Sequence, residues 1–233
     1  MRIIFIRHGE PDYQNDCLTE AGRAQAAAVA ERLAGEGICE IYASPCGRAA
    51  ETAAYTAARL NLPVTTLDFM REIGWGGPGI PHKGHPWTLG DKMLEAGFDF
   101  SGEDWRAHPW FRENVATAQY GMIAGSFDAF LEERGYRHEG RRFRCLRGAD
   151  RTIALFSHGG SGACVLSHLL NLAFPYVCAV LPYDFTSVIV LDFPVRPGEY
   201  VFPRVDLFND CAHIRRLGDG PRLQRESERI SGY

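Results

Sequence analysis

The amino-acid sequence predicts an α/β fold: a three-layer sandwich with a mostly parallel central sheet, helices on both faces and an inserted cap region. Short runs rich in β-branched residues alternate with Ala-rich stretches of helical length up to residue 75, and this alternation returns near residue 150. A Gly- and Pro-rich stretch interrupts it. At 233 residues we therefore expect a single domain, with a core at 1–75 and 148–212 and a cap insertion at 76–147.

The first part of the chain shows strand and helix signals in regular order. "RIIFI" is a short apolar run, typical of a strand buried on both faces. Thr19 can cap the first helix, and Pro45 suits the first turn of the second. We expect strands at 2–6, 40–44 and 63–69 and helices at 20–34 and 45–60.

The later part of the chain predicts a more varied set of elements. Residues 74–86 form a Gly- and Pro-rich loop, and residues 87–112 are aromatic and polar without a clear period. The tail after Arg215 is polar, and we expect it to be loosely ordered. Between these segments we expect helices at 114–134 and 161–173, a hairpin at 136–146, and strands at 151–157, 186–193 and 198–207, the last two paired.

Composition excludes several classes of function. The net charge of −4 gives no basic field for nucleic acid, and no apolar run has membrane-spanning length. The N-terminal apolar stretch is too short for a secretory signal peptide. Seven irregularly spaced cysteines without a C-x-x-C motif favour reduced thiols in the cytoplasm over disulfides or a zinc site. The oligomeric state cannot be inferred.

Charged residues and histidines follow three of the predicted strands. Arg7 and His8 end the first strand, Arg48 lies in the helix after the second, and His158 follows the strand at 151–157. The carboxyl ends of parallel strands lie along one edge of a sheet, where α/β proteins bind ligands. Arginines and helix N-termini at that edge favour an anion, and arginine suits phosphate oxygens. The sequence therefore predicts a phosphate pocket that contains imidazoles.

An imidazole in such a pocket can act as a nucleophile. Neutral histidine can attack phosphorus and form a phosphohistidine, while arginines gather the charge on the transferring group. A leaving alkoxide needs a proton, so the scheme requires a nearby carboxylic acid. Glu72, just after the third predicted strand, is the best candidate.

Four sequence blocks together resemble the histidine phosphatase superfamily, which includes the cofactor-dependent phosphoglycerate mutases. The blocks are "RHGE" from Arg7, "SPCGRAAETA" from Ser44, "REIGWG" from Arg71 and "SHGG" from Ser157. "LTEAGRAQA" (18–26) resembles the family's first helix, whereas the insertion at 76–147 matches nothing in the family pattern. The chain departs from several members at Cys46-Gly47, where they have a bulkier basic or polar pair.

The resemblance implies a role for each matched residue. His8 would be the nucleophile, Glu72 the proton donor, and Arg7, Arg48 and His158 the ligands of the phosphoryl group. His158 would complete the catalytic set with His8 and Glu72. The family uses no metal, and we expect no cofactor.

These features predict a metal-independent phosphomonoester hydrolase that acts through phosphohistidine on a small phosphorylated metabolite. Phosphoglycerate mutase-type transfer is the alternative, disfavoured because no second anion site is clear near the core motifs. More distant alternatives are a non-catalytic phosphate-binding protein and a serine hydrolase. In the last, Ser161 of "GGSGA" would work with His213 and with Asp184 or Asp192.

The insertion contains further aromatic residues and histidines. His82 and His85 are spaced H-x-x-H, but without further ligands we interpret them as loop residues or as cap residues that face substrate. We expect the four tryptophans to form a small core of the cap rather than an apolar substrate pocket. They are Trp75, Trp87, Trp105 and Trp110.

Overall fold

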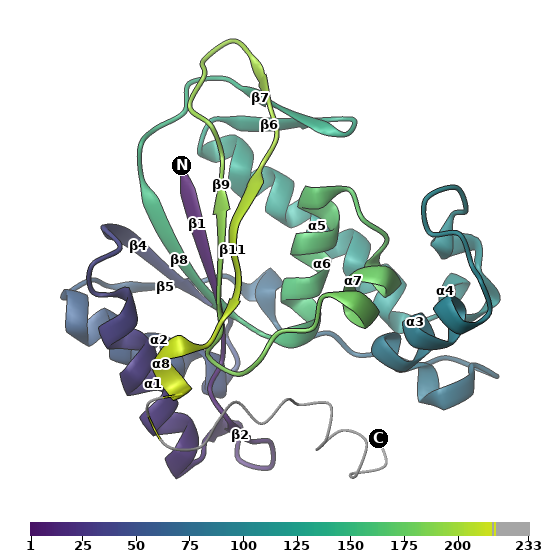
Figure 1. The fold of residues 1–233 in the computed structure, drawn as a ribbon, viewed down its shortest axis with the longest axis horizontal. Helices are drawn as coiled ribbons and strands as arrows, with labels where there is room; N and C mark the ends of the chain where they lie inside the picture. Colours follow the sequence, from purple (N-terminus) through teal and green to yellow (C-terminus); the bar gives the residue numbers. More distant parts are fainter. Residues whose placement is uncertain (216, 218–233) are drawn as a thin grey trace.

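The computed structural model describes residues 1–215 and 217, and its centre is a six-stranded sheet (Figure 1). The strand order is β11-β9-β1-β8-β4-β5. The strands β1, β8, β4 and β5 run parallel to one another, whereas β9 runs antiparallel to both β1 and β11. This confirms the mostly parallel central sheet. The strands are β1 (Arg2–Arg7), β4 (Ile38–Ala43), β5 (Val64–Thr66), β8 (Thr152–Ser157), β9 (Val188–Asp192) and β11 (Arg204–Asp210).

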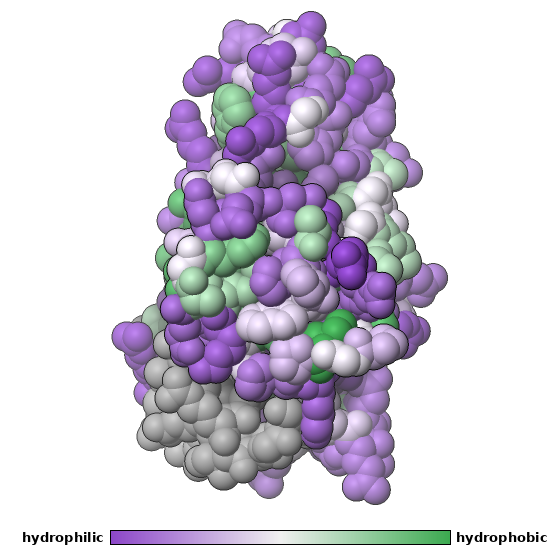
Figure 2. Space-filling model, turned by 90° about the vertical axis from the view of Figure 1, so that its right-hand side faces the viewer, coloured by the Kyte–Doolittle hydropathy of each residue, from purple (hydrophilic) through white to green (hydrophobic). Residues whose placement is uncertain are grey.

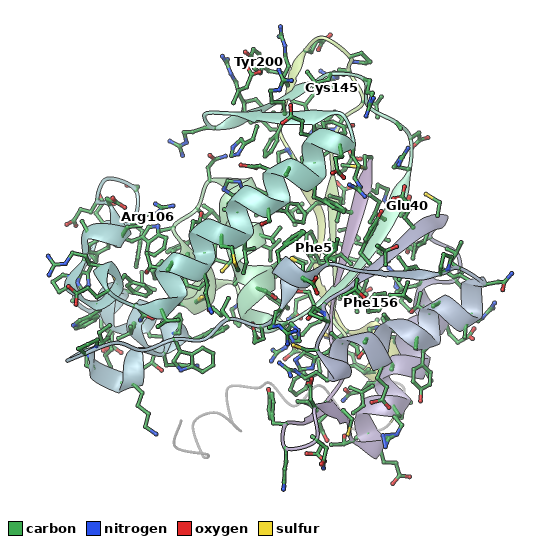
Figure 3. All side chains as sticks on the ribbon, turned by 180° about the vertical axis from the view of Figure 1, so that it is seen from behind. Phe5, Glu40, Arg106, Cys145, Phe156 and Tyr200 are labelled. Atoms are coloured by element: carbon green, nitrogen blue, oxygen red, sulfur yellow. The ribbon has the colours of Figure 1, made fainter. Side chains whose placement is uncertain are left out.

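Helices cover both faces of this sheet. Side chains alternate between the two faces along each strand, so both faces carry apolar residues that need to be covered. Ile4 and Ile6 of β1 pack in the hydrophobic cluster under α1 (Glu20–Leu33) and α2 (Gly47–Leu60). Ile3 and Phe5 point the other way, into the cluster that includes residues of α5 (Val115–Glu133) and α6 (Gly159–Leu170). Figure 3 shows Phe5 on the α5 side of the sheet. The predicted three-layer sandwich is thereby confirmed.

Local signals set most of the element boundaries correctly. The Thr19 hydroxyl accepts a hydrogen bond from the Gly22 N–H and caps α1, as expected. The predicted hairpin consists of β6 (Tyr136–Glu139) and β7 (Arg142–Cys145). The remaining short strands are β2 (Pro11–Asp12), β3 (Cys17–Leu18) and β10 (Tyr200–Val201).

Several elements differ from the prediction. The predicted strand at 198–207 is two strands, of which β11 pairs with β9 and β10 pairs with β7. The third strand ends at Thr66, because the chain turns into the 3-10 helix η1 (Asp68–Met70). The predicted helix at 161–173 is two helices, because Asn171 adopts a left-handed conformation that ends α6 before α7 (Phe174–Val180) begins. The helix α3 (Pro86–Glu95) lies in a stretch where no period was visible.

The insertion and the core share one hydrophobic cluster. Phe127 of α5 packs on Phe5 of β1, with 6.0 Å between ring centroids. Strand β7 pairs with β10, which lies outside the insertion in sequence. The predicted division at residues 76 and 147 stays a prediction, but α5 clearly completes the second helical layer. The other elements of the insertion are α4 (Pro109–Arg112), η2 (Pro81–Gly84) and η3 (Trp105–Ala107), and α8 (Ala212–Arg215) ends the described core.

The helices α3 and α4 project to one side of the molecule in Figure 1. The face on that side is mostly hydrophilic, with hydrophobic side chains in small separate patches (Figure 2). Within the described residues no single helix is long and apolar enough to cross a membrane, although α6 and α7 pass that test as a pair bent by 117°. The predicted polar tail lies outside the described residues apart from Leu217.

Candidate active site

The carboxyl ends of β1 and β8 place two histidines side by side. His8 follows β1 and His158 follows β8, and the two neighbouring strands run parallel. Both side chains are buried, with 1% and 0% of the residue surface exposed, and their ring centroids are 5.1 Å apart. Arg7 and Arg48 lie in the same cluster and are also buried. The structure therefore brings together the four residues that the sequence placed at this edge.

The tautomer of His8 follows from its backbone contact. Its Nδ1 lies 2.7 Å from the Gly9 carbonyl oxygen. A carbonyl oxygen only accepts, so Nδ1 carries the proton and Nε2 keeps its lone pair in the neutral ring. Burial and the charge of Arg7 hold the pKa of His8 well below its usual range. His8 is therefore neutral near pH 7, with a free electron pair on Nε2.

Two guanidinium groups flank this imidazole. Arg48 donates from Nε to His8 Nε2 at 3.4 Å and from Nη1 to Asp16 Oδ1 at 2.6 Å. Arg7 donates from Nη1 to the Tyr183 carbonyl oxygen at 2.8 Å. Each arginine has donors beyond those used in these contacts, because a guanidinium carries five N–H groups. Positive charge is therefore concentrated around the free nitrogen of His8.

His158 is held from the neighbouring strand. Its Nε2 lies 2.7 Å from the hydroxyl of Ser44 at the end of β4, and its Nδ1 is buried without a hydrogen-bond partner in the described structure. Burial, followed by the charges of Arg48, Arg7 and Arg71, lowers the pKa of His158 well below its usual range. Arg71 is thus a third arginine whose charge reaches the site, and the sequence prediction did not include it.

Glu72 lies beside His158, at the start of α6. Its Oε1 accepts from the Ser161 N–H and the Ile73 N–H, each at 2.9 Å, and its Oε2 accepts from the Gly160 N–H at 3.2 Å. The carboxylate therefore accepts two backbone donors at the N-terminus of α6, where a negative charge is favourable. The structure places Glu72 at the predicted sheet edge and gives it a helix-capping contact as well.

Comparison with known proteins identifies the family. Residues 3–86 match the histidine phosphatase superfamily (branch 1). A probable phosphoglycerate mutase of Yersinia enterocolitica is 29% identical over 224 residues, covering 92% of this chain and 95% of the relative. A mycobacterial glucosyl-3-phosphoglycerate phosphatase, solved with inorganic phosphate, is 27% identical with a TM-score of 0.59, covering 91% and 98% of the two chains. These matches support placing the chain in the histidine phosphatase superfamily.

Another solved structure shares the histidine phosphatase fold. A phosphoserine phosphatase of Entamoeba histolytica, in complex with 3-phosphoglyceric acid, has a TM-score of 0.61 over 91% of this chain and 98% of its own, at 23% identity. The curated relative carries a mutase name and the solved structures carry phosphatase names. The named proteins are thus phosphatases and a mutase, and the similarity supports enzyme status for this chain.

A loop after α7 completes the candidate site, and the sequence did not indicate it. The Phe185 ring lies 4.5 Å from the Arg7 guanidinium carbon and 5.5 Å from the His8 ring. The Thr186 N–H donates to the carbonyl oxygens of both Arg7 and His8, although Thr186 has a positive φ of 51°. A β-branched residue adopts this conformation only where its surroundings fix it.

The departure from the family pattern at Cys46-Gly47 has a structural reason. A Cβ at Gly47 would lie 2.1 Å from the Asp16 carbonyl oxygen, so only glycine fits. The Gly47 N–H donates to Asp16 Oδ2 at 2.7 Å. Burial raises the pKa of Asp16, but the hydrogen bonds from Gly47 and Arg48 outweigh it and lower the pKa overall. At this edge of the site, Asp16 therefore occupies the space that a side chain at position 47 would need.

The tryptophans separate into two groups. Trp105 is buried against Phe111 and other cap aromatics, as expected for a cap core. Trp87 instead borders the site, because a Cβ built at Gly159 would lie 3.5 Å from both Trp87 and Arg7. Its ring stacks on His85, which caps α3 through Thr88. Part of the insertion therefore forms an aromatic wall beside Arg7.

The contacts of Ser161 do not support the serine-hydrolase alternative. Its hydroxyl is fully buried and bonds the Ser157 hydroxyl and the Met70 carbonyl oxygen. His213 Nε2 bonds the Thr186 hydroxyl instead. In the part of the chain that the structure describes, these contacts assemble no nucleophile–histidine pair around Ser161.

Proposed function

We propose that this chain is a metal-independent phosphomonoester hydrolase that acts through a phosphohistidine on a small phosphorylated metabolite. The observation that carries the proposal is the state of His8: a buried neutral imidazole with its proton fixed on Nδ1 by Gly9 and its Nε2 beside Arg48. A nucleophile at phosphorus needs such an electron pair, and the dianion it attacks needs neighbouring positive charge.

The proposed first step transfers the phosphoryl group to the enzyme. His8 Nε2 forms a bond to phosphorus while the bond from phosphorus to the leaving oxygen breaks, and Glu72 delivers a proton to that oxygen. In the second step water attacks the phosphohistidine, Glu72 takes the proton of the water, and His8 Nε2 recovers its electron pair. Arg7 and Arg48 hold the oxygens of the transferring group throughout.

His158 has a place in the same scheme. Its lowered pKa reflects burial and the positive charge of the nearby arginines. A phosphate dianion in the pocket opposes both effects, since negative charge favours the protonated imidazole. We therefore propose that His158 binds the phosphoryl group as a hydrogen-bond donor once substrate enters.

The surroundings of the pocket suggest two features of the substrate. The aromatic wall with Trp87 suits an apolar or ring-shaped moiety on the phosphate ester. The exposed Arg71 suits a second anionic group such as a carboxylate. This second feature also fits a phosphoglycerate, so mutase activity is the second candidate, supported by the name of the Yersinia relative.

We also propose a cytoplasmic site of action. All seven cysteines are unpaired in the structure, which suits a reducing compartment. Fractionation of the native host would test this part of the proposal, and recovery of the protein outside the cytoplasm would contradict it.

A phosphoenzyme trapping experiment tests the proposed function. Wild-type protein is mixed with labelled substrate, quenched, and assayed for acid-labile, base-stable phosphate on the protein. His8→Ala should remove both the label and turnover, while His82→Ala, in the exposed loop, should keep both. A label that persists on the His8→Ala protein would refute the assignment. Parallel assays of phosphate release and of 2- and 3-phosphoglycerate interconversion separate hydrolase from mutase.

A further inference from the structure

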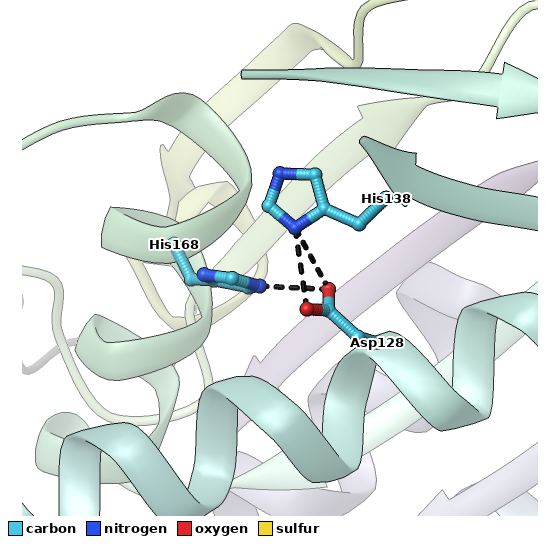
Figure 4. A group of neighbouring side chains, drawn as sticks. All are labelled: Asp128, His138 and His168. Carbon is cyan, nitrogen blue, oxygen red and sulfur yellow. Dashed lines mark hydrogen bonds and ion pairs between the residues drawn. The ribbon is translucent and has the colours of Figure 1, made fainter. Parts of the chain in front are cut away.

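A second cluster of ionisable side chains lies at the other end of α6. Asp128 of α5, His138 of β6 and His168 of α6 converge on one point (Figure 4). Asp128 Oδ1 lies 2.7 Å from His168 Nε2 and 3.0 Å from His138 Nδ1. Nine residues separate His168 from Gly159 at the start of α6, which is about 14 Å along the helix. The cluster is therefore separate from the phosphate pocket.

The groups in this cluster are those that bind transition metals. Each histidine turns one ring nitrogen toward the carboxyl group of Asp128 (Figure 4). Two imidazole nitrogens and one carboxylate oxygen form a common protein ligand set for Zn²⁺ and related divalent ions.

We propose that Asp128, His138 and His168 bind one divalent transition-metal ion of the zinc type. The candidate ligand atoms all lie within 4.8 Å of one another. Tetrahedral bonds of about 2.0–2.1 Å place ligand atoms about 3.3 Å apart, so the two separations of 2.7 and 3.0 Å between Asp128 and the histidines need to widen by only a few tenths of an ångström. His138 would move its proton from Nδ1 to Nε2 and His168 from Nε2 to Nδ1, so binding releases no net proton.

The surroundings leave a coordination position for solvent. Both histidines line an open cavity of about 420 Å³, together with Arg106, Tyr120 and Ser167. A water molecule from this cavity supplies the fourth ligand. The ion would fasten α5, α6 and the β6–β7 hairpin together, away from His8. It would thus stabilise the insertion against the core and leave phosphoryl transfer unchanged.

The contacts around the histidines predict moderate affinity for the ion. His138 Nε2 is buried without a hydrogen-bond partner in the described structure, whereas a metal-bound histidine usually donates its other N–H to an acceptor. The site therefore has its three direct ligands but lacks one supporting contact, so we expect it to release zinc to strong chelators.

Zinc binding to chelator-stripped full-length protein tests the proposal. We would titrate Zn²⁺ against a chromophoric competitor, in a Cys39→Ser background that removes the exposed thiol. We expect one ion per chain, with affinity lowered at least about 100-fold in Asp128→Asn. Glu132→Gln is the matched control, because it removes one negative charge from the same helix outside the cluster and should bind like wild type.

Two further measurements, the thermal midpoint and the Co²⁺ spectrum, test the proposal if Asp128→Asn folds poorly. Zinc should raise the thermal midpoint of wild type and Glu132→Gln, but not that of His168→Gln. Co²⁺ on wild type should give a four-coordinate spectrum without a thiolate charge-transfer band. Equal affinity in wild type and Asp128→Asn, or a thiolate band, would overturn the proposal and leave the trio a hydrogen-bonded cluster. A change in phosphatase activity would bear on the proposed function instead.

Discussion

Replacing Glu72 by glutamine separates its proposed chemical role from its structural one. The carboxylate accepts three backbone N–H groups, two on Oε1 and one on Oε2. A glutamine can keep its carbonyl oxygen at the Oε1 position and so retain the contacts with Ile73 and Ser161. Its amide nitrogen then faces the Gly160 N–H, where two donors oppose each other.

The two roles predict effects of different size and kind. A donor left without its acceptor in this half-buried place costs about 1–3 kcal/mol of folding free energy. Loss of a general acid slows the chemical step by about 10²–10⁴-fold, which is about 3–5 kcal/mol. The structural cost does not depend on the substrate. The chemical cost does, because an alkoxide needs its proton during departure and a nitrophenolate does not.

Single-turnover burst kinetics measures the difference. We expect Glu72→Gln to slow phosphorylation of His8 by an alkyl phosphate about 10²–10⁴-fold, and by p-nitrophenyl phosphate far less. Phosphoenzyme should then accumulate, because its hydrolysis still needs a base for water. Glu10→Gln is the matched control: Glu10 is also half-buried, and its Oε1 accepts only the Thr19 hydroxyl among the described contacts.

Equal slowing with both substrates would refute the acid role. Glu72 would then only hold the N-terminus of α6 in place beside His158. A leaving-group-dependent loss in Glu10→Gln instead would assign the proton transfer to that residue.

Three other predictions follow from the site. Exhaustive chelation should leave turnover unchanged, and loss of turnover restored by Mg²⁺ would contradict the proposed mechanism. Arg71→Met should raise KM for 3-phosphoglycerate about five-fold, the worth of about 1 kcal/mol, more than for p-nitrophenyl phosphate; equal changes would exclude a second-anion role. Burial lowers the pKa of His85 and of His213 from 6.5 to about 4. Between these pH values the unfolded chain binds more protons than the folded chain, so the free energy of unfolding should fall as the pH falls. Equal urea midpoints at pH 7 and pH 5 would contradict this.

The core of the fold and the centre of the site were predictable because their signals are local. A strand buried on both faces must be apolar along its whole length, as "RIIFI" is. Polar residues directly after such strands must lie at the sheet edge, and the sequence alone therefore predicted that His8 and His158 lie together. The helix α5 was visible for the same reason, since its buried residues recur at helical spacing.

The first part of the insertion, residues 76–112, was less predictable because its helices are short. The helix α3 has ten residues, and its start depends on His85 as a cap, a role that imidazole rarely fills. Trp87 belongs to this helix, and its position beside Arg7 follows from the packing of α3 on α7. No local pattern reports such a contact between distant segments.

The loop Tyr183–Thr186 shows why the rest of the site escaped detection. Its Tyr183 carbonyl oxygen accepts from Arg7, its Phe185 ring lies against His8, and its Thr186 N–H donates to backbone carbonyl oxygens. None of these contacts can be recognised from a residue type in the sequence. The glycine-rich "GGSG" segment shows the converse. Its resemblance to a hydrolase elbow is local, but a Cβ at Gly162 would lie 2.2 Å from the Tyr183 hydroxyl, which donates to the His158 carbonyl oxygen. The glycine is therefore explained by a residue twenty-one positions later that fixes the backbone of His158. The motif around Ser161 is a packing requirement of the candidate site, not a nucleophile of its own.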